Sequence, residues 1–342
     1  MKVLYAIQGT GNGHLSRARD IIPILKRKPV ELDILISGTQ ADVQIPYPVR
    51  YRFQGLSFIF GERGGVDVWR TYLKANARRL QREMNSLPVQ QYDLVINDFE
   101  PVSAWACKLR NQPCISLSHQ AAVLASGTPK PKKRDPMGEF ILRKYAPGTL
   151  QFGFHFKPYQ PHIFTPVIRQ EIRRARVREG DYYTVYLPAY NEEKLIENLS
   201  RVENAKWEVF SKHSQKIRDT GKLLIRPVIN EAFVKSMAGS RGILCGAGFE
   251  TPAEALFLQK KLMVIPMKGQ YEQQCNMAAL GEMGVPVLKS LKRKHLHTLQ
   301  EWVDSDVRVA VDYPDNTVRI IDQLLETALE HNARFSYGEP SY

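Results

Sequence analysis

The sequence is poor in cysteine and has no long apolar run. Only four of its 342 residues are cysteine, and none forms a CxxC pair, so neither a disulfide framework nor a cysteine-based metal centre is expected. No apolar run approaches the roughly 20 residues that cross a bilayer. The first residues, MKVLYAIQGTG, have the pattern of a buried strand and not of a signal peptide. These absences predict a cytoplasmic globular protein.

Acidic residues are also scarce relative to basic ones. The 48 Lys and Arg outnumber the 35 Asp and Glu, giving a net charge of +13. This balance suits either a solvated surface or an anionic partner, such as a nucleotide, nucleic acid or membrane. Two clusters stand out, KPKKR at 130–134 and five Arg within 169–178. Neither cluster has interleaved aromatic residues, so no specific nucleic acid is expected.

The chain alternates short apolar runs with helical patterns, twice over. Residues 2–7 predict a buried strand, 16–28 a helix and 32–37 a second strand, which together form a βαβ unit of a parallel sheet. Segment 50–60 has a strand-like or irregular pattern, 125–138 predicts a long exposed loop, and 145–166 lacks periodicity. The other predicted strands are 92–97, 113–117, 182–187, 205–210, 222–225, 242–245 and 262–265. The other predicted helices are 68–87, 101–110, 192–199, 230–238, 252–258, 271–283, 296–303 and 317–329. The fold class is therefore α/β, with two Rossmann-like doubly wound domains that face each other across a cleft.

A glycine loop follows the first strand. Gly9, Gly11 and Gly13 would let backbone amides approach a phosphate or another close partner. The dinucleotide fingerprint GxGxxG is not met, but from Gly11 the loop reads GxGxxS, with Asp33 at a suitable distance for a ribose. An NAD-dependent enzyme is therefore one alternative, and close packing of a helix on the sheet is another.

His14 and Asp98 are candidate catalytic residues because ligands of parallel sheets bind outside the carboxyl ends of the strands. Both residues fall at such ends, as do Ser118 and His119. The imidazole of His14 can deprotonate a hydroxyl, and Asp98 can orient the ring. The structural alternative is that His14 bonds only to backbone and Asp98 caps a helix.

Two polar motifs lie in the stretch 246–276. The first polar motif is Gly248-Phe249-Glu250-Thr251 with Glu254, at a predicted helix start that suits a diphosphate. The structural alternative is a capping box of Thr251 and Glu254. The second polar motif is Glu272-Gln273 with Asn276, whose side chains share a helix face and suit sugar hydroxyls.

These motifs resemble the donor-binding region of the GT-B glycosyltransferases, notably the UDP-glycosyltransferases and the bacterial N-acetylglucosaminyltransferase that makes lipid II. Those families carry a glycine, then Ser or Thr three residues later, then Glu three beyond, as the first polar motif does. They next carry Asp-Gln-x-x-Asn or Gln-Gln-x-x-Asn, which the second polar motif matches with Glu in the first place. Gly13-His14 resembles the family's Gly-His, whose His is the proposed base, and Asp98 resembles its acidic partner.

The resemblance implies an acceptor domain at 1–164, a donor domain at 165–316, and a C-terminal helix and tail at 317–342 that return to the first domain. It also implies an inverting, metal-independent transfer of a sugar from a UDP- or dTDP-sugar to an acceptor hydroxyl, with no cofactor. The implied donor contacts are Gly248, Phe249, Glu250 and Thr251 at the diphosphate, Glu254 at the ribose, and Glu272, Gln273 and Asn276 at the sugar. Val228 and Phe233 are implied at the base, and Arg226 at a phosphate.

The chain departs from the family at the first polar motif. It lacks the phosphate-binding His of the plant enzymes, and Glu250 adds a carboxylate that is unfavourable beside a diphosphate unless it points away or meets a cation. A nucleotide-sugar 2-epimerase on the same fold and a non-enzymatic nucleotide- or nucleic-acid-binding protein stay as alternatives. The acceptor is open between a lipid, a saccharide and a small molecule. The basic loop at 130–134 is either solvated or a contact with an anionic membrane at the inner face.

Overall fold

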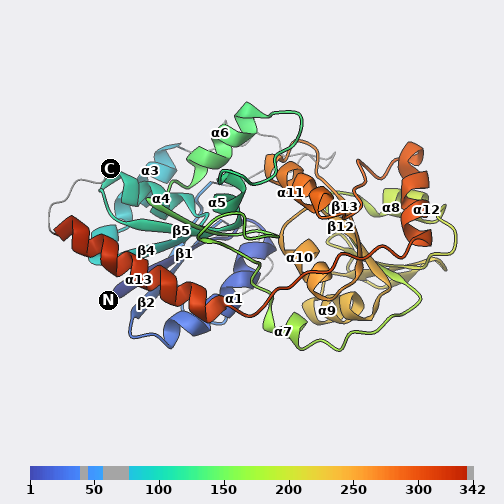
Figure 1. Cartoon of the computed structure of the whole chain (residues 1–342), viewed down its shortest axis with the longest axis horizontal. Coiled ribbons are helices and arrows are strands. Elements are labelled where there is room, and N and C mark those ends of the chain that lie inside the picture. The colour runs from blue at the N-terminus through green and yellow to red at the C-terminus, as the bar shows by residue number, and fades with distance from the viewer. Residues whose placement is uncertain (39–44, 57–76, 337–342) are drawn as a thin grey trace.

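The computed structural model describes residues 1–38, 45–56 and 77–336, the last six of these as backbone only. The described residues form two sheets, one in each half of the chain (Figure 1). The first sheet contains β1 (Lys2–Gln8), β2 (Glu31–Ser37), β3 (Tyr51–Phe53), β4 (Leu94–Asp98), β5 (Cys114–Ser118), β6 (Leu150–Phe154) and β7 (Ile163–Phe164). The second contains β8 (Tyr183–Tyr186), β9 (Trp207–Ser211), β10 (Arg218–Asp219), β11 (Leu223–Pro227), β12 (Gly242–Gly246) and β13 (Lys261–Ile265).

Helices connect the strands within each half and cover the sheets. In the first half these are α1 (Asn12–Lys26), α3 (Ala77–Ser86), α4 (Pro101–Leu109), α5 (His119–Leu124) and α6 (Pro136–Tyr145), with the short 3-10 helix η1 (Val89–Gln91). The second half has α7 (Gln170–Arg173), α8 (Glu192–Leu199), α9 (Asn230–Gly239), α10 (Glu250–Phe257), α11 (Tyr271–Glu282) and α12 (Leu296–Asp304), with η2 (Arg293–His295). The chain ends in α13 (Thr317–Ser336).

Both sheets are doubly wound, which confirms the predicted fold class. The first has the order β3-β2-β1-β4-β5-β6-β7, with every neighbouring pair parallel. The second has the order β10-β11-β9-β8-β12-β13 and is parallel except for the β10–β11 pair. Strand order reverses between β1 and β4 in one sheet and between β8 and β12 in the other. Ligands of such folds bind at these switch points.

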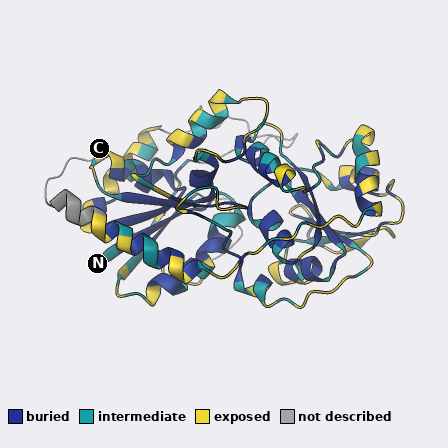
Figure 2. Ribbon diagram, viewed as in Figure 1, coloured by how far each residue is buried: buried dark blue, intermediate teal, exposed yellow. Residues whose placement is uncertain are grey.

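The central strands are buried on both faces, as their nearly continuous apolar sequences require. Val3, Tyr5 and Ile7 of β1 are fully buried in the largest core cluster, and Figure 2 shows the same burial along the strands of both halves. A second cluster packs Tyr183, Trp207 and Trp302 between β8, β9 and α12. Each half therefore has apolar packing of its own.

Several element predictions need correction. Segment 145–166, predicted as irregular, contains β6 and β7, and the predicted loop at 125–138 is shortened by α6. Helix α1 begins at Asn12, four residues before the predicted start, so Gly13 and His14 lie in its first turn. The antiparallel strand β10 was not predicted. Parts of the predictions for 50–60 and 68–87 fall on residues 57–76, outside the described residues.

The last helix, α13, packs against the first half of the chain, beside α1 (Figure 1). Its apolar face buries Ile320, Ile321 and Leu324 in the largest core cluster, and Asp322 pairs with Lys28. The chain thus crosses back from the second half to the first. The predicted boundary at 164/165 falls directly after β7, the one at 316/317 directly before α13, and both stay predictions. No described helix is long and apolar enough to cross a membrane.

Candidate functional site

A cavity of about 270 Å³ lies between the two halves, at the switch point of the first sheet and the start of α10. It brings together eight of the predicted site residues: Gly11, Gly13, His14, Gly248, Phe249, Glu250, Glu272 and Gln273. The other described residues that line it are Gln8, Thr10, Arg17, Phe99, His119, Gln120, Gly138, Ile141, Leu142, Gly269, Gln270 and Tyr271. Two predicted motifs that are far apart in sequence therefore face one another.

The three glycines of the first loop do different things. A Cβ on Gly9 would lie 2.9 Å from Ile36 and from the carbonyl oxygen of Ser37, so this glycine lets the chain pass close to β2. Gly11 has a φ of 102°, a conformation that favours glycine, and it directly precedes α1. A Cβ on Gly13 would lie 3.0 Å from the Cγ of Glu250. The close partner of Gly9 is therefore β2, and the close partner of Gly13 is the start of α10.

His14 points its Nε2 edge toward the cavity and its Nδ1 edge toward Asp98. Nδ1 lies 2.8 Å from Oδ1 of Asp98, which is completely buried behind the ring. Burial raises the pKa of Asp98, but Arg17 and His14 outweigh it, so the pKa lies below its ordinary value. Nη2 of Arg17 also lies 3.2 Å from Nδ1, but it already donates to both Asp98 oxygens. Because an ionised Asp98 can only accept, we assign the proton to Nδ1, which leaves Nε2 as the basic nitrogen. This is the arrangement that a general base needs.

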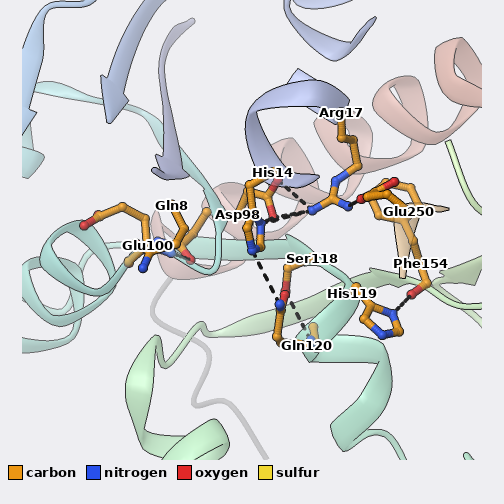
Figure 3. A network of polar contacts seen from close by, with 12 residues as sticks. Gln8, His14, Arg17, Asp98, Glu100, Ser118, His119, Gln120, Phe154 and Glu250 are labelled. Carbon is orange, nitrogen blue, oxygen red and sulfur yellow. Dashed lines mark hydrogen bonds and ion pairs between the residues drawn. The ribbon is translucent and has the colours of Figure 1, made fainter. Parts of the chain in front are cut away.

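Arg17 was not predicted, although it lies one helical turn after His14 and shares its helix face. Its Nη2 donates to both Asp98 oxygens, at 2.7 and 2.8 Å, and its Nη1 donates to Oε1 of Glu250. Burial lowers the pKa of Arg17, but Asp98 and Glu250 outweigh this and raise it. Figure 3 shows the guanidinium between His14 and Asp98 on one side and Glu250 on the other. Arg17 thus joins the two halves of the chain.

The chain turns sharply directly after Asp98. Phe99 has a φ of 56°, which is uncommon for a residue with a side chain. Its ring stacks on that of Tyr145 at 4.6 Å and lines the cavity. Unusual backbone of this kind concentrates at functional sites.

The start of α10 has no side-chain cap from any described residue. Phe249 occupies the N-cap position and Thr251 is the second helical residue, so the alternative of a Thr251–Glu254 capping box is wrong. The first backbone N–H groups of α10 consequently have no side-chain acceptor at the cap. Helix α1 likewise begins at Gly11, without a side-chain cap from the part of the chain that the structure describes. Two helix N-termini with their partial positive charge therefore meet at one cavity.

The carboxylate of Glu250, which is unfavourable beside a diphosphate unless it points away or meets a cation, pairs with a cation. Its carboxylate does not point away but meets the guanidinium of Arg17. Burial raises the pKa of Glu250 to about 7, with Arg17 acting in the opposite direction. The carboxyl group therefore changes its charge near neutral pH, directly beside the predicted base.

Gln120 was also not predicted, although it directly follows Ser118 and His119 at the end of β5. Its Nε2 donates to Oε2 of Glu272 at 3.0 Å and lies 3.4 Å from Nε2 of His14. Its Oε1 is buried and has no partner among the described residues. The amide thus connects the predicted base with a predicted sugar-binding carboxylate and leaves one acceptor free. In the second polar motif, next to Glu272, Oε1 of Gln273 accepts from the Met267 amide at 2.9 Å.

Asn276 lies behind the cavity wall. It is fully buried, with its amide nitrogen donating to the Ala247 carbonyl at 3.1 Å and its oxygen 2.7 Å from Nε2 of His119. The His119 ring stacks on Phe249 at 3.9 Å, and burial lowers the pKa of this histidine. Asn276 therefore fixes the contact between the two halves, and the predicted sugar contact at this residue stays a prediction.

Glu254 does not line the cavity either. Both of its oxygens accept from Arg169, at 2.5 and 2.8 Å, and the residue is only 2% exposed. Arg169 also donates to Glu171 and Asn230, at 2.6 and 2.7 Å. The first residue of the Arg-rich cluster therefore has an internal partner. A ribose contact at Glu254 requires release from this pair.

Arg226, Val228 and Phe233 lie away from the cavity. Arg226 pairs with Glu208 at 2.5 Å and lines a different hollow of the second half. Val228 packs against the largest core cluster, and Phe233 packs on Phe210 at 5.1 Å. Their predicted contacts with a phosphate and a base stay predictions.

No group of three or more His, Cys, Asp or Glu among the described residues could hold a metal ion. The described residues of the cavity offer an imidazole, two helix N-termini, one guanidinium, and polar side chains on the opposite wall. This set suits proton removal from a hydroxyl beside a bound anion.

Comparison with known proteins identifies glycosyltransferases as similar to this chain. The model of the family described as Glycosyl transferase family 1 matches residues 1–304. No curated protein sequence matches the chain. Among solved structures, UGT89C1 of Arabidopsis thaliana complexed with UDP is 13% identical, with a TM-score of 0.59, over 96% of this chain and 94% of that one. MurG of Acinetobacter baumannii is 15% identical, with a TM-score of 0.55, over 94% and 99%.

At such identities these structures show the fold, which is that of the GT-B glycosyltransferases, and they confirm the predicted resemblance. The family match removes the NAD-dependent enzyme and the non-enzymatic binding protein from the alternatives. The chain belongs to glycosyl transferase family 1 and is a glycosyltransferase.

Proposed function

We propose that the protein is an inverting, metal-independent glycosyltransferase that moves a sugar from a UDP- or dTDP-sugar to an acceptor hydroxyl. The observation that carries the proposal is the His14–Asp98 pair, 2.8 Å apart, which faces the uncapped start of α10 across one cavity. A base and an anion site on opposite walls are what a single displacement at a sugar carbon needs. The similarity of the fold to UGT89C1, which was solved in complex with UDP, supports the donor class.

In the proposed step the acceptor oxygen attacks the anomeric carbon as Nε2 of His14 takes the hydroxyl proton. The bond from the anomeric carbon to the diphosphate oxygen breaks, and the nucleoside diphosphate leaves. One attack from the opposite face inverts the configuration. Asp98 stabilises the imidazolium that forms, because its pKa lies below the ordinary value and it stays ionised.

The leaving diphosphate would lie at the start of α10. The amides around Gly248 and Thr251 point their positive end toward negative charge that grows in the transition state. Arg17 and the start of α1 add positive potential on the opposite wall. Helix N-termini and a guanidinium can stabilise such charge without a metal ion, which supports a transfer without metal or other cofactor.

The acceptor would approach from the first half of the chain. A second cavity of about 440 Å³ adjoins the first and shares Phe99, Gln120 and Leu142 with it. The free Oε1 of Gln120 can accept from the attacking hydroxyl or a neighbouring one. We therefore place the acceptor against α5 and α6, with its hydroxyl beside Gln120 and His14 and within hydrogen-bond reach of both.

Helix α6 also suits a membrane contact. Met137 and Phe140 are 56% and 50% exposed on this helix, and the basic loop precedes it. Lys130 in that loop is turned inward and donates to the Val123 carbonyl, whereas Lys132, Lys133 and Arg134 are exposed. Apolar and basic side chains on one surface favour an anionic membrane at the inner face and a lipid acceptor over a free saccharide.

A thermal-shift screen against UDP-, dTDP- and GDP-sugars tests the donor class. We expect a UDP- or dTDP-sugar to raise the melting temperature and GDP-sugars to leave it unchanged; no response to any nucleotide sugar contradicts the proposal. Incubation with the donor alone then separates a transferase from a 2-epimerase. A transferase leaves the configuration at C2 of the sugar intact. A nucleotide sugar epimerised at C2 would instead show that the protein is the 2-epimerase.

A further inference from the structure

Among the described residues, the wall that would face the diphosphate has little positive charge. Of the described residues that line the cavity, Arg17 is the only Lys or Arg, and its side chain is 1% exposed. Three carboxylates oppose this single positive charge. Glu250 and Glu272 line the cavity, and Asp98 is buried behind the wall. A diphosphate carries more negative charge than this wall can neutralise while Arg17 is held by two carboxylates.

Glu250 lies where an anion bound to α10 would lie. It is the first residue of the helix, and its Cγ packs against Gly13 at the start of α1. Its carboxylate therefore lies between the two helix N-termini and contacts Arg17, the one guanidinium among the described residues of the wall. Helix N-termini and a guanidinium are the groups that bind phosphate in proteins.

We propose that Glu250 is an internal anion that occupies the diphosphate position in the empty enzyme and yields Arg17 to the diphosphate when the donor binds. The inference rests on the proposed function, because it concerns the same donor. It adds Arg17 as a residue that touches the leaving group, and Glu250 as its competitor.

The geometry allows this exchange without loss of the base. Arg17 holds Asp98 through Nη2 and Glu250 through Nη1, so Nη1 can turn to a phosphate oxygen while Nη2 stays on Asp98. The Nε of Arg17 is buried without a partner among the described residues and is a further donor for the new ligand. One guanidinium would then connect the leaving group with the acid that orients His14.

Titration calorimetry of wild type, Glu250→Gln and Arg17→Lys with UDP, inorganic pyrophosphate and uridine tests the exchange. The pH is set to 8, above the value of about 7 to which burial raises the pKa of Glu250, so that the carboxylate is ionised. We expect Glu250→Gln to tighten UDP and pyrophosphate about tenfold and to leave uridine within about twofold, since like charge beside a ligand costs binding energy. Arg17→Lys should weaken UDP about tenfold and leave uridine unchanged.

Glu282→Gln is the control, because it removes an exposed carboxylate at the end of α11, outside the residues that line the cavity. It should change UDP affinity by less than about threefold. If Glu250→Gln binds UDP as wild type does, or more weakly, Glu250 is a plain bridge between the halves and the exchange is overturned while the proposed function stands. If wild type binds neither UDP nor uridine but pyrophosphate still tightens in Glu250→Gln, the UDP donor is overturned and the exchange stands. If no probe binds any variant, both fail.

Discussion

Two buried arginines in this protein hold pairs of carboxylates, and both reach α10. Arg17 joins Asp98 to Glu250, and Arg169 joins Glu171 to Glu254, one helical turn further along the helix. The chemistry is nearly the same at the two places. The surroundings differ, because Arg17 lies beside His14 on the cavity wall, whereas Arg169 lies outside the cavity, in the segment that follows β7.

The role of a buried ion pair therefore depends on its surroundings as well as on its partners. A pair closed on itself is at best neutral for stability and mainly costly to interrupt. A pair with one member on a cavity wall can exchange that member for a ligand. We therefore assign the Arg169 cluster to the structure of the molecule and the Arg17 cluster to its chemistry.

The largest expected effect is at the base itself. His14→Ala should lower the rate of transfer by about a thousandfold, because a positioned base contributes roughly that factor. UDP affinity should stay within about twofold. Release of UDP from the donor and titration calorimetry measure the two effects, and His297→Ala, an exposed histidine of α12, is the control. Wild-type turnover in His14→Ala would show that His14 is not the base, and that the reaction does not depend on the Arg17 cluster.

The Arg169 cluster should respond in stability instead. Arg169→Met leaves Glu254 buried without its cation, which costs about 3–5 kcal/mol of unfolding free energy. Urea denaturation measures this loss, and exposed Arg174→Met in the same stretch should stay within about 0.5 kcal/mol. If Arg169→Met instead keeps its stability and loses UDP binding, the cluster belongs to the donor site and Glu254 reaches the ribose.

A smaller effect is expected at Gln120, which connects the two walls. Gln120→Leu removes the amide between His14 and Glu272 and the free acceptor Oε1. We expect kcat/KM for the acceptor to fall about tenfold, the effect of one lost hydrogen bond at a buried site. UDP affinity should not change, and exposed Gln215→Leu serves as control. Weaker UDP binding with unchanged kcat would place Gln120 at the donor.

The smallest effect concerns the outer surface of the first half. Replacing Lys132, Lys133, Met137 and Phe140 together by Ser should reduce sedimentation with phosphatidylserine vesicles several-fold, since exposed basic and apolar side chains both favour contact with such a surface. Vesicles of neutral lipid should bind neither protein. Replacing the exposed Lys292, Arg293 and Lys294 of the second half is the matched control. Equal sedimentation of all variants would remove the membrane contact.

The strand and helix pattern could be predicted where apolar runs are long, as in β1, β4 and β12. It failed at β6 and β7, because prolines and aromatic residues interrupt the period and β7 has only two residues. Sequence spacing also predicted His14, Asp98 and Glu250 as site residues, and the structure brings these three side chains together around Arg17. The spacing did not find Arg17, whose helical pattern fits a solvated basic face as well, nor the Arg169–Glu254 pair, whose partners are 85 residues apart. The packing of the two halves decides which buried carboxylate faces a cavity, and sequence spacing does not contain this information.

A crystal structure of the protein with UDP compares the two clusters most directly. We expect the diphosphate at the start of α10, within hydrogen-bond distance of the amides around Gly248–Thr251. Nη1 of Arg17 should lie on a phosphate oxygen, Glu250 should have left the guanidinium, and the Arg169–Glu254 pair should be intact. UDP bound with the Arg17–Glu250 contact unbroken, or bound away from α10, would contradict the assignment of the Arg17 cluster to the donor site.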